Sequence, residues 1–204
     1  DLELDPDEWD AADREALARE IRIRTKPMVV AANKMDTEAA QDNWETVTDD
    51  PAYEHLTFVP VSAHAEKALK NGDEQDVLDY RPGDDDFTVT ADLPEEKAAG
   101  LEQIREFVAA FGGTGVQRAL ETALFEELGA IAVFPGARKP QEDGTFLQDC
   151  FVLPDGSTAE DFAYFLHTDI GDGFLHAHDV RSGRQVGADT ELDHRDVVEI
   201  TTTN

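Results

Sequence analysis

The chain has 204 residues, of which 40% are hydrophobic, so its length allows one large domain or two small ones and its composition allows a buried core. Asp and Glu together number 46 against 17 Lys and Arg, which gives a formal net charge of −29. Such a charge opposes binding to phosphate backbones at low salt, and because the chain has no run of about 18 apolar residues, we expect no membrane-spanning helix.

The acidic excess has a particular composition, because Asp outnumbers Glu and Arg outnumbers Lys. Apolar periodic segments run through most of the chain, so a solvated acidic surface fits better than disorder. The composition resembles that of proteins from halophiles that accumulate salt, in which molar salt screens the repulsion between like charges. Under such salt, net charge neither establishes nor excludes a nucleic-acid partner.

Cys150 is the single cysteine, so no intrachain disulfide can form, and this favours a reducing cytoplasm. The apolar residues that follow it predict a small buried side chain rather than a reactive thiol. The first ten residues contain no initiator Met and no signal-like apolar stretch, so we expect the sequence to begin inside a longer protein.

Residues 1–70 alternate predicted helices and strands. Helices are predicted over 10–24, with acidic residues early and Arg late, and over 37–49. Continuous apolar runs at 28–32 and 56–61 predict strands, and such runs are typical of strands buried on both faces of a parallel sheet. With another helix from about Glu66, the alternation predicts part of a doubly wound α/β sheet.

The middle of the chain is predicted to be an acidic loop or insertion at 71–93, followed by helices at 94–111 and 116–128. The intervening Gly-Gly-Thr-Gly (112–115) resembles a phosphate-binding loop only superficially. It follows a helix rather than a strand and lacks the Gly-Lys-Ser/Thr ending, so a turn between two helices is predicted.

A compact α+β unit is predicted from Ala130 onward. Thr158 and Asp161 form a capping-box sequence, which predicts a helix whose apolar face ends at Ile170, with Gly171 just beyond it. The predicted strands of this unit lie at 131–135, 150–153, 174–180, 184–186 and 197–201.

Three polar residues, Asn33, Lys34 and Asp36, follow the first predicted strand. Guanine presents a ring N1–H and an exocyclic amine side by side, and the Asp36 carboxylate can accept from both. Adenine lacks this donor pair and would leave the carboxylate unpaired. Asn33 can bridge the other base edge and nearby backbone, while the Lys34 stem can lie across the ring. These residues predict a guanine pocket, at the end of the strand where ligands of open α/β sheets bind.

The second predicted strand ends at Ser62 and Ala63. A small residue there allows a backbone N–H to approach guanine O6, and the Ser62 hydroxyl can support Asp36. Met35 and His64 are possible residues of the pocket rim, although His64 could equally face solvent. Two ordinary surface loops are the alternative interpretation, but the occurrence of both sequences after apolar strands, a strand–helix–strand apart, favours the pocket.

The histidines do not predict a metal site. His176 and His178 alternate along a predicted strand and therefore point to the same face, with His167 on the preceding helix. Because no Cys partner and no ligand spacing accompany them, structural or exposed histidines are expected. His167 is expected to close the helix.

The residues Asn-Lys-Met-Asp (33–36) and Ser-Ala (62–63) resemble the fourth and fifth motifs of a P-loop GTPase domain, a P-loop NTPase fold. From about Ala130 the chain resembles a TGS domain, a small β-grasp-like module, through LPDGSTAEDFAYFLHTDIGDGF and ADTELDHRDVVEI. Together they resemble archaeal TGS-containing GTP-binding proteins of the Obg/YchF family. YchF proper has Glu in place of the last Asp of the fourth motif and prefers ATP. This sequence keeps Lys34 and Asp36, so the resemblance implies GTP or GDP as the ligand.

The chain departs from this family in lacking both G-x-x-x-x-G-K-[ST] and D-x-x-G, the motifs that hold phosphates and Mg²⁺ and position water. The resemblance therefore implies a C-terminal fragment of a GTPase, with phosphate and Mg²⁺ binding upstream and no catalytic residue in these 204 residues. We expect the parent protein to hydrolyse GTP and the fragment alone to be inactive.

The resemblance divides the chain into the C-terminal part of a GTPase domain (1–70), an acidic insertion with a helical segment (71–129) and a TGS domain (130–204). It implies a translation-factor-class GTP-binding protein of the cytoplasm, whose TGS module contacts the ribosome, RNA or another partner. The alternative function is an RNA- or protein-binding module that binds no nucleotide.

Overall fold

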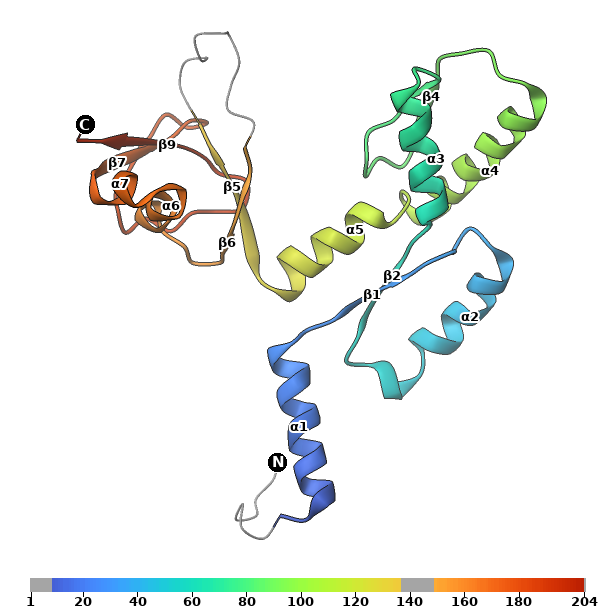
Figure 1. Ribbon diagram of the computed structural model, residues 1–204, viewed down its shortest axis with the longest axis horizontal. Coiled ribbons are helices and arrows are strands. Elements are labelled where there is room, and N and C mark those ends of the chain that lie inside the picture. Colours follow the sequence, from blue (N-terminus) through green and yellow to red (C-terminus); the bar gives the residue numbers. More distant parts are fainter. Residues whose placement is uncertain (1–8, 137–148, 204) are drawn as a thin grey trace. The chain divides into compact units, whose positions relative to one another are not determined.

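The computed structural model describes residues 9–136 and 149–203, and the chain divides into two units, Asp1–Ala123 and Leu124–Asn204 (Figure 1). Each unit has a hydrophobic core of its own.

The first unit begins with the predicted alternation of helices and strands. Its elements up to residue 74 are α1 (Ala11–Thr25), β1 (Val29–Ala32), α2 (Glu38–Thr48), the 3₁₀ turn η2 (Pro51–Tyr53), β2 (Thr57–Pro60) and α3 (Ala63–Glu74). Helix α1 starts at a capping box formed by Asp10 and Asp13, and Arg22 and Arg24 occupy its last turn, as the helix dipole favours. No residue of α1 is buried.

Strands β1 and β2 are parallel, in a register that runs from Val29 opposite Thr57 to Ala32 opposite Pro60. The expected burial of β1 on both faces is not observed, because none of its residues is fully buried and Met28 just before it is 44% exposed. In the described part of the chain β1 pairs with β2 alone, so no neighbouring strand covers its other edge.

The core of the first unit lies between α3 and α4 (Glu95–Phe111). The short antiparallel pair β3 (Leu78–Asp79) and β4 (Thr88–Val89) contributes Leu78 to this core, whereas both residues of β4 are exposed. The segment 71–93, predicted as a loop, therefore contains the end of α3 and this strand pair. The buried residues of this core are Met35, Ala65, Leu69, Leu78, Tyr80, Phe87, Phe107 and Val108.

The Gly-Gly-Thr-Gly segment is a turn between helices, as predicted. It joins α4 to α5 (Val116–Glu121), and Gly112, Gly113 and Gly115 all have positive φ angles, which glycine adopts without steric cost. The backbone of Gly115 lies against β2, where an added Cβ would come within 1.9 Å of the Pro60 carbonyl oxygen. After α5 the chain continues as the π-helical segment η3 (Thr122–Glu127) rather than as one regular helix to 128.

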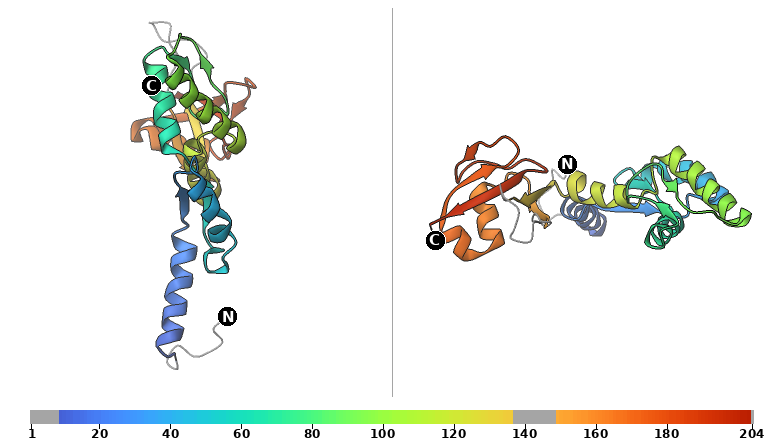
Figure 2. Two further views of the ribbon diagram at one scale, coloured as in Figure 1. Left: turned by 90° about the vertical axis from the view of Figure 1, so that its right-hand side faces the viewer. Right: turned by 90° about the horizontal axis from the view of Figure 1, so that it is seen from above.

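The second unit is a mixed sheet with its helices on one side (Figure 2). Its strand order is β6-β5-β9-β7-β8, with β5 parallel to β9 and the other pairs antiparallel. The buried Phe162 of α6 packs with Val133, Ala177 and Val198 from three strands. The elements are β5 (Ala130–Pro135), β6 (Phe151–Pro154), α6 (Ala159–Leu166), α7 (Thr168–Asp172), β7 (Phe174–Asp179), β8 (Gln185–Val186) and β9 (Val197–Thr202).

The single helix predicted from Thr158 to Ile170 is in fact two helices. His167 has an extended backbone with φ −168° and ends α6, while its Nδ1 accepts a hydrogen bond of 3.1 Å from the Asp169 N–H and caps α7. The predicted apolar face is therefore interrupted: Phe165 is 55% exposed, and Gly171 lies inside α7. Cys150, predicted to be buried, is exposed because it precedes the first paired residue of β6.

Candidate functional site

The two polar segments that follow β1 and β2 lie at the same edge of the parallel pair. The Val61 N–H donates to the Ala32 carbonyl over 2.9 Å, and the Met35 N–H donates to the Val61 carbonyl over 3.1 Å. These bonds continue the pairing of the two strands beyond their ends, so the segments 33–36 and 61–64 form one surface.

Asn33 is the side chain that joins the two segments. Its Oδ1 accepts from the Lys34 N–H at 2.8 Å and from the Ala63 N–H at 3.1 Å, across 30 residues of sequence. The sequence predicted that a backbone N–H near Ser62 and Ala63 would approach guanine O6, and the N–H of Ala63 is already bonded to Asn33. Among the described residues, nothing accepts a hydrogen bond from the N–H of His64, which lies in the first turn of α3. His64 therefore offers the backbone donor at this edge.

Lys34 has a left-handed backbone with φ 68°, a conformation that is uncommon for residues other than glycine. Its carbonyl accepts from both the N–H and the hydroxyl of Thr37, each over 2.9 Å. This turn leads into α2 and leaves the side chains of Asn33, Lys34 and Asp36 exposed, where a ligand can reach them.

Met35 and Ser62 are buried and serve packing and capping. Met35 is 2% exposed and belongs to the core of the first unit, so it does not form the predicted pocket rim. Ser62 is fully buried, and its hydroxyl oxygen accepts from the Ala65 N–H at 3.0 Å, which caps α3. This capping contact was not among the roles that the sequence predicted for Ser62.

Sequence reasoning missed three residues that hold the second segment in place. The Ser62 N–H donates to the Thr114 carbonyl over 2.9 Å. The Thr114 hydroxyl donates to Glu66 Oε2 over 2.6 Å, and the Tyr80 hydroxyl donates to the same oxygen over 2.8 Å. Burial, together with the Glu66 carboxylate, raises the pKa of Tyr80 above its usual range. Because 48 residues separate Glu66 from Thr114, no local sequence pattern indicates this network.

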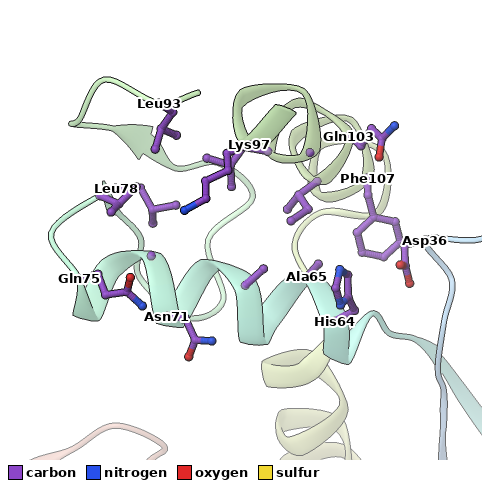
Figure 3. A pocket seen from close by; sticks show the side chains of 16 residues that line it. Asp36, His64, Ala65, Asn71, Gln75, Leu78, Leu93, Lys97, Gln103 and Phe107 are labelled. Carbon is purple, nitrogen blue, oxygen red and sulfur yellow. The ribbon is translucent and has the colours of Figure 1, made fainter. Parts of the chain in front are cut away.

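Asp36 and His64 also line one end of a cavity of about 490 Å³ between α3 and α4, where Phe107 lies beside Asp36 (Figure 3). The Asp36 carboxylate is thus exposed between the strand edge and this cavity. These groups fit the donor and acceptor pattern of a guanine base: the exposed carboxylate of Asp36, the free backbone N–H of His64 and the side-chain stem of Lys34.

The described residues contain no group of three or more His, Cys, Asp or Glu side chains that could hold a metal ion. His176 and His178 lie on one face of β7, as predicted, with ring centroids 4.8 Å apart in an edge-to-face arrangement. The sequence has no G-x-x-x-x-G-K-[ST] motif of the kind that holds the phosphates and Mg²⁺ of a nucleotide. Among the helices of residues 9–136 and 149–203, none is long and apolar enough to cross a membrane.

Comparison with known proteins gives matches over nearly the whole chain. Residues 31–137 match the family described as Obg-like GTPase YGR210-like, G4 motif-containing domain, and residues 132–202 match the TGS domain. An uncharacterized GTP-binding protein of Methanocaldococcus jannaschii is 33% identical over 203 residues, which are 98% of this chain and 51% of that protein. The crystal structure of a GTP binding protein from Pyrococcus horikoshii superimposes with a TM-score of 0.65 at 33% identity, over 98% of this chain and 52% of that chain. The chain thus spans about half the length of these relatives.

Proposed function

The chain belongs to the Obg-like GTPases of the YGR210-like family, whose G4 motif-containing domain it carries together with a TGS domain, and we propose that it supplies the guanine-recognition part of a GTP-binding protein. The predicted fold class, an α/β unit followed by a small α+β TGS domain, is confirmed. Both relatives are described as GTP-binding proteins, which supports GTP or GDP as the ligand.

The observation that supports this proposal most directly is the hydrogen bond of 3.1 Å from the Ala63 N–H to Asn33. It draws the segments after β1 and β2 to one edge while Asp36 stays exposed beside them. We propose that Asp36 accepts from guanine N1–H and from the exocyclic amine, that the His64 N–H donates to O6, and that the Lys34 stem covers one face of the ring.

This arrangement selects guanine over adenine through its polar groups. Adenine has no donor pair for Asp36, and its amino group would meet the backbone donor of His64 instead of an acceptor oxygen. Sites built around such hydrogen bonds reject the wrong ligand strongly, because their polar groups are left unpaired. Asn33, Ser62 and Ala63 contribute by holding the two segments together, and Asn33 can also reach the base edge.

The sequence lacks the motifs that bind the phosphates and Mg²⁺ of a nucleotide. We propose that a segment equivalent to the part of the longer relatives outside this match binds them. The predicted segments 1–70, 71–129 and 130–204 are retained in this proposal as the C-terminal part of the GTPase domain, the acidic helical insertion and the TGS domain. No catalytic residue is assigned within them. GTP hydrolysis is a proposed activity of the whole protein.

We also propose that the TGS domain contacts the ribosome, RNA or a translation partner, with nucleotide binding as the switch, in the cytoplasm of an archaeon. The net charge of −29 supports a setting of high salt, where repulsion between carboxylates is screened.

The proposal is tested by equilibrium binding of fluorescent GDP, with ADP as control, to the chain extended to the length of its relatives, in molar KCl. We expect tight and guanine-selective binding, loss of that selectivity in Asp36→Ala, and much weaker binding by the 204-residue chain alone. The matched control is Asp42→Ala, which removes an exposed carboxylate of α2. This variant should bind GDP as the unmodified protein does.

Equal affinity for GDP and ADP in a folded longer chain would contradict the proposal. In that case the segment 33–36 would be a surface loop, and the TGS domain would remain as the functional part of an RNA- or protein-binding module.

A further inference from the structure

The cavity between α3 and α4 extends well beyond the guanine edge. Its volume of about 490 Å³ falls within the usual range of small-molecule sites, about 300–1,000 Å³. Most of its lining is apolar and comes from both helices and from the segments around β3 and β4. The apolar lining residues include Ala68, Leu78, Leu93, Leu101, Ile104 and Phe107.

A few polar groups face this apolar lining from opposite sides. Lys97, from the first turns of α4, points toward α3 and toward Gln75, the residue that follows the last turn of α3, and Asp36 lies at the far end (Figure 3). Within the described residues, the Lys97 ammonium makes no hydrogen bond or ion pair. Among the described residues that line the cavity, Lys97 is the only Lys or Arg and Asp36 the only Asp or Glu, and the two lie at opposite ends (Figure 3). An anion beside Lys97 would therefore meet a positive charge that has no ion-pair partner there.

Gly100 in the middle of α4 leaves the cavity open. Its backbone is not left-handed, and an added Cβ would have no heavy atom within 4 Å, so neither conformation nor packing requires a glycine. Glycine is less favourable than alanine inside a helix. Because Gly100 has no side chain, the cavity keeps free space at this position, one helical turn after Lys97.

From these features we propose that the cavity binds a small amphipathic anion, with an aromatic or aliphatic body and a single carboxylate, sulfonate or phosphate group. The body packs on the apolar lining, the anionic group pairs with Lys97, and the Gln75 amide donates a hydrogen bond to one of its oxygens. A chain of net charge −29 repels anions from its surface in general, so retention of one requires a local site of this kind. The proposal does not depend on the guanine site, because it uses different residues.

The test uses 8-anilinonaphthalene-1-sulfonate, a fluorescent aromatic anion, titrated into the full chain in molar KCl. We expect one saturable site whose affinity falls about tenfold or more in Lys97→Met, which removes the charge-assisted contact but keeps the apolar stem. The matched control is Lys67→Met, an exposed lysine of α3 outside the cavity, and it should bind within about twofold of the unmodified chain.

Gly100→Leu should abolish binding by filling the cavity, and thermal melts followed by circular dichroism establish that the variants are folded. If Leu unfolds the chain, Gly100→Ala should weaken binding in the same direction. Octanoate should displace the probe, whereas octanol, a neutral amphiphile of equal length, should not at the same concentration.

Equal losses in Lys97→Met and Lys67→Met would overturn the proposal, since the effect would then be general surface charge. The proposal would also be overturned if folded Gly100→Leu bound the probe with full affinity, because the probe would then be bound elsewhere. If Gly100→Leu does not fold, the same conclusion applies to Gly100→Ala. Equal displacement by octanol would overturn the proposal as well, since it would leave only a hydrophobic groove without anion selectivity.

Discussion

At the scale of single residues, Asn33 is a structural link as well as a candidate contact to the base. Its side-chain oxygen accepts two backbone N–H groups, at 2.8 and 3.1 Å, and so joins the segments after β1 and β2. The sequence predicted that Asn33 could bridge to neighbouring backbone. It did not predict that the partner would be Ala63. Because the Ala63 N–H donates to Asn33, it is not available to donate to the base.

Replacing Asn33 by Ala should destabilise the first unit by about 0.5–1.5 kcal/mol, because the exposed Ala63 N–H exchanges its protein acceptor for water and the link between the two segments is lost. Asn33→Asp is the matched control, since it keeps an oxygen in reach of both donors and should lose less. Urea unfolding monitored by circular dichroism measures the difference. Equal midpoints for the two variants would show that this oxygen does not hold the segments together.

Thr114 has an analogous role on the opposite side of the second segment. In Thr114→Val the shape is kept but the hydroxyl donor to Glu66 is lost, while Tyr80 still donates to the same carboxylate. We expect a loss of about 1–2 kcal/mol in the free energy of unfolding, since a hydrogen bond to a charged group is removed. The same change at Thr46, exposed on α2, should alter stability by less than about 0.5 kcal/mol. Comparable losses at both positions would argue against the Glu66 network.

At the scale of the elements, the capping box of α6 was predictable from sequence in full. The Thr158 N–H and hydroxyl both donate to Asp161 Oδ2, at 2.9 and 2.8 Å, and the Asp161 N–H donates back to the Thr158 hydroxyl at 3.2 Å. These hydrogen bonds hold the pKa of Asp161 below its usual range. A carboxyl with a lowered pKa stabilises the fold above the pKa of the unfolded chain, and this contribution is lost as the pH falls through the folded value.

The stability difference between the unmodified chain and Asp161→Asn should therefore be present at pH 7 and shrink below about pH 4. Thermal melts across this pH range measure it. Asp189→Asn serves as the control, because Asp189 is exposed and caps no helix in the described part of the chain, so its difference should stay near zero throughout. A difference for Asp161→Asn that is constant with pH would contradict the ionised capping box.

Other element boundaries were not predictable, for identifiable reasons. Helical periodicity continues through His167, but the bond from the Asp169 N–H to the His167 ring favours a break there. The apolar run at 28–32 indicated a strand correctly, whereas its burial depends on neighbouring strands, which sequence pattern does not reveal. Gly112–Gly115 indicated a turn, but its contact with β2 could not be inferred from glycines alone.

At the scale of the whole molecule, the two units differ in how well their strands are covered. Strand β5 pairs on both sides, and Val133 within it is fully buried. Strand β1 has no fully buried residue. Both fold classes were predictable because apolar runs and turn residues delimit the elements. The cavity and the Glu66 network depend on segments distant in sequence, and so they required the structure.

This difference predicts that the TGS unit is the better ordered part of the 204-residue chain. In hydrogen exchange followed by mass spectrometry, amides of β5 and β9 should exchange at least about tenfold more slowly than those of β1 and β2. Faster exchange in the TGS core than in residues 28–32 and 56–61 would contradict the expectation.

The central claim is that Asp36 recognises guanine by accepting two hydrogen bonds from the base. The most direct test changes the hydrogen-bonding groups of residue 36 and of the base at the same time. Xanthine carries an oxo group where guanine has its amine, so the amide of Asp36→Asn can donate to the oxo group and accept from N1–H. Affinities for GDP and xanthosine diphosphate are measured on the longer chain with and without this substitution, and their ratio cancels effects on folding and phosphate contacts. We predict a shift of the ratio toward xanthosine diphosphate by about a hundredfold or more. An unchanged ratio would contradict the role of Asp36 in recognising the base.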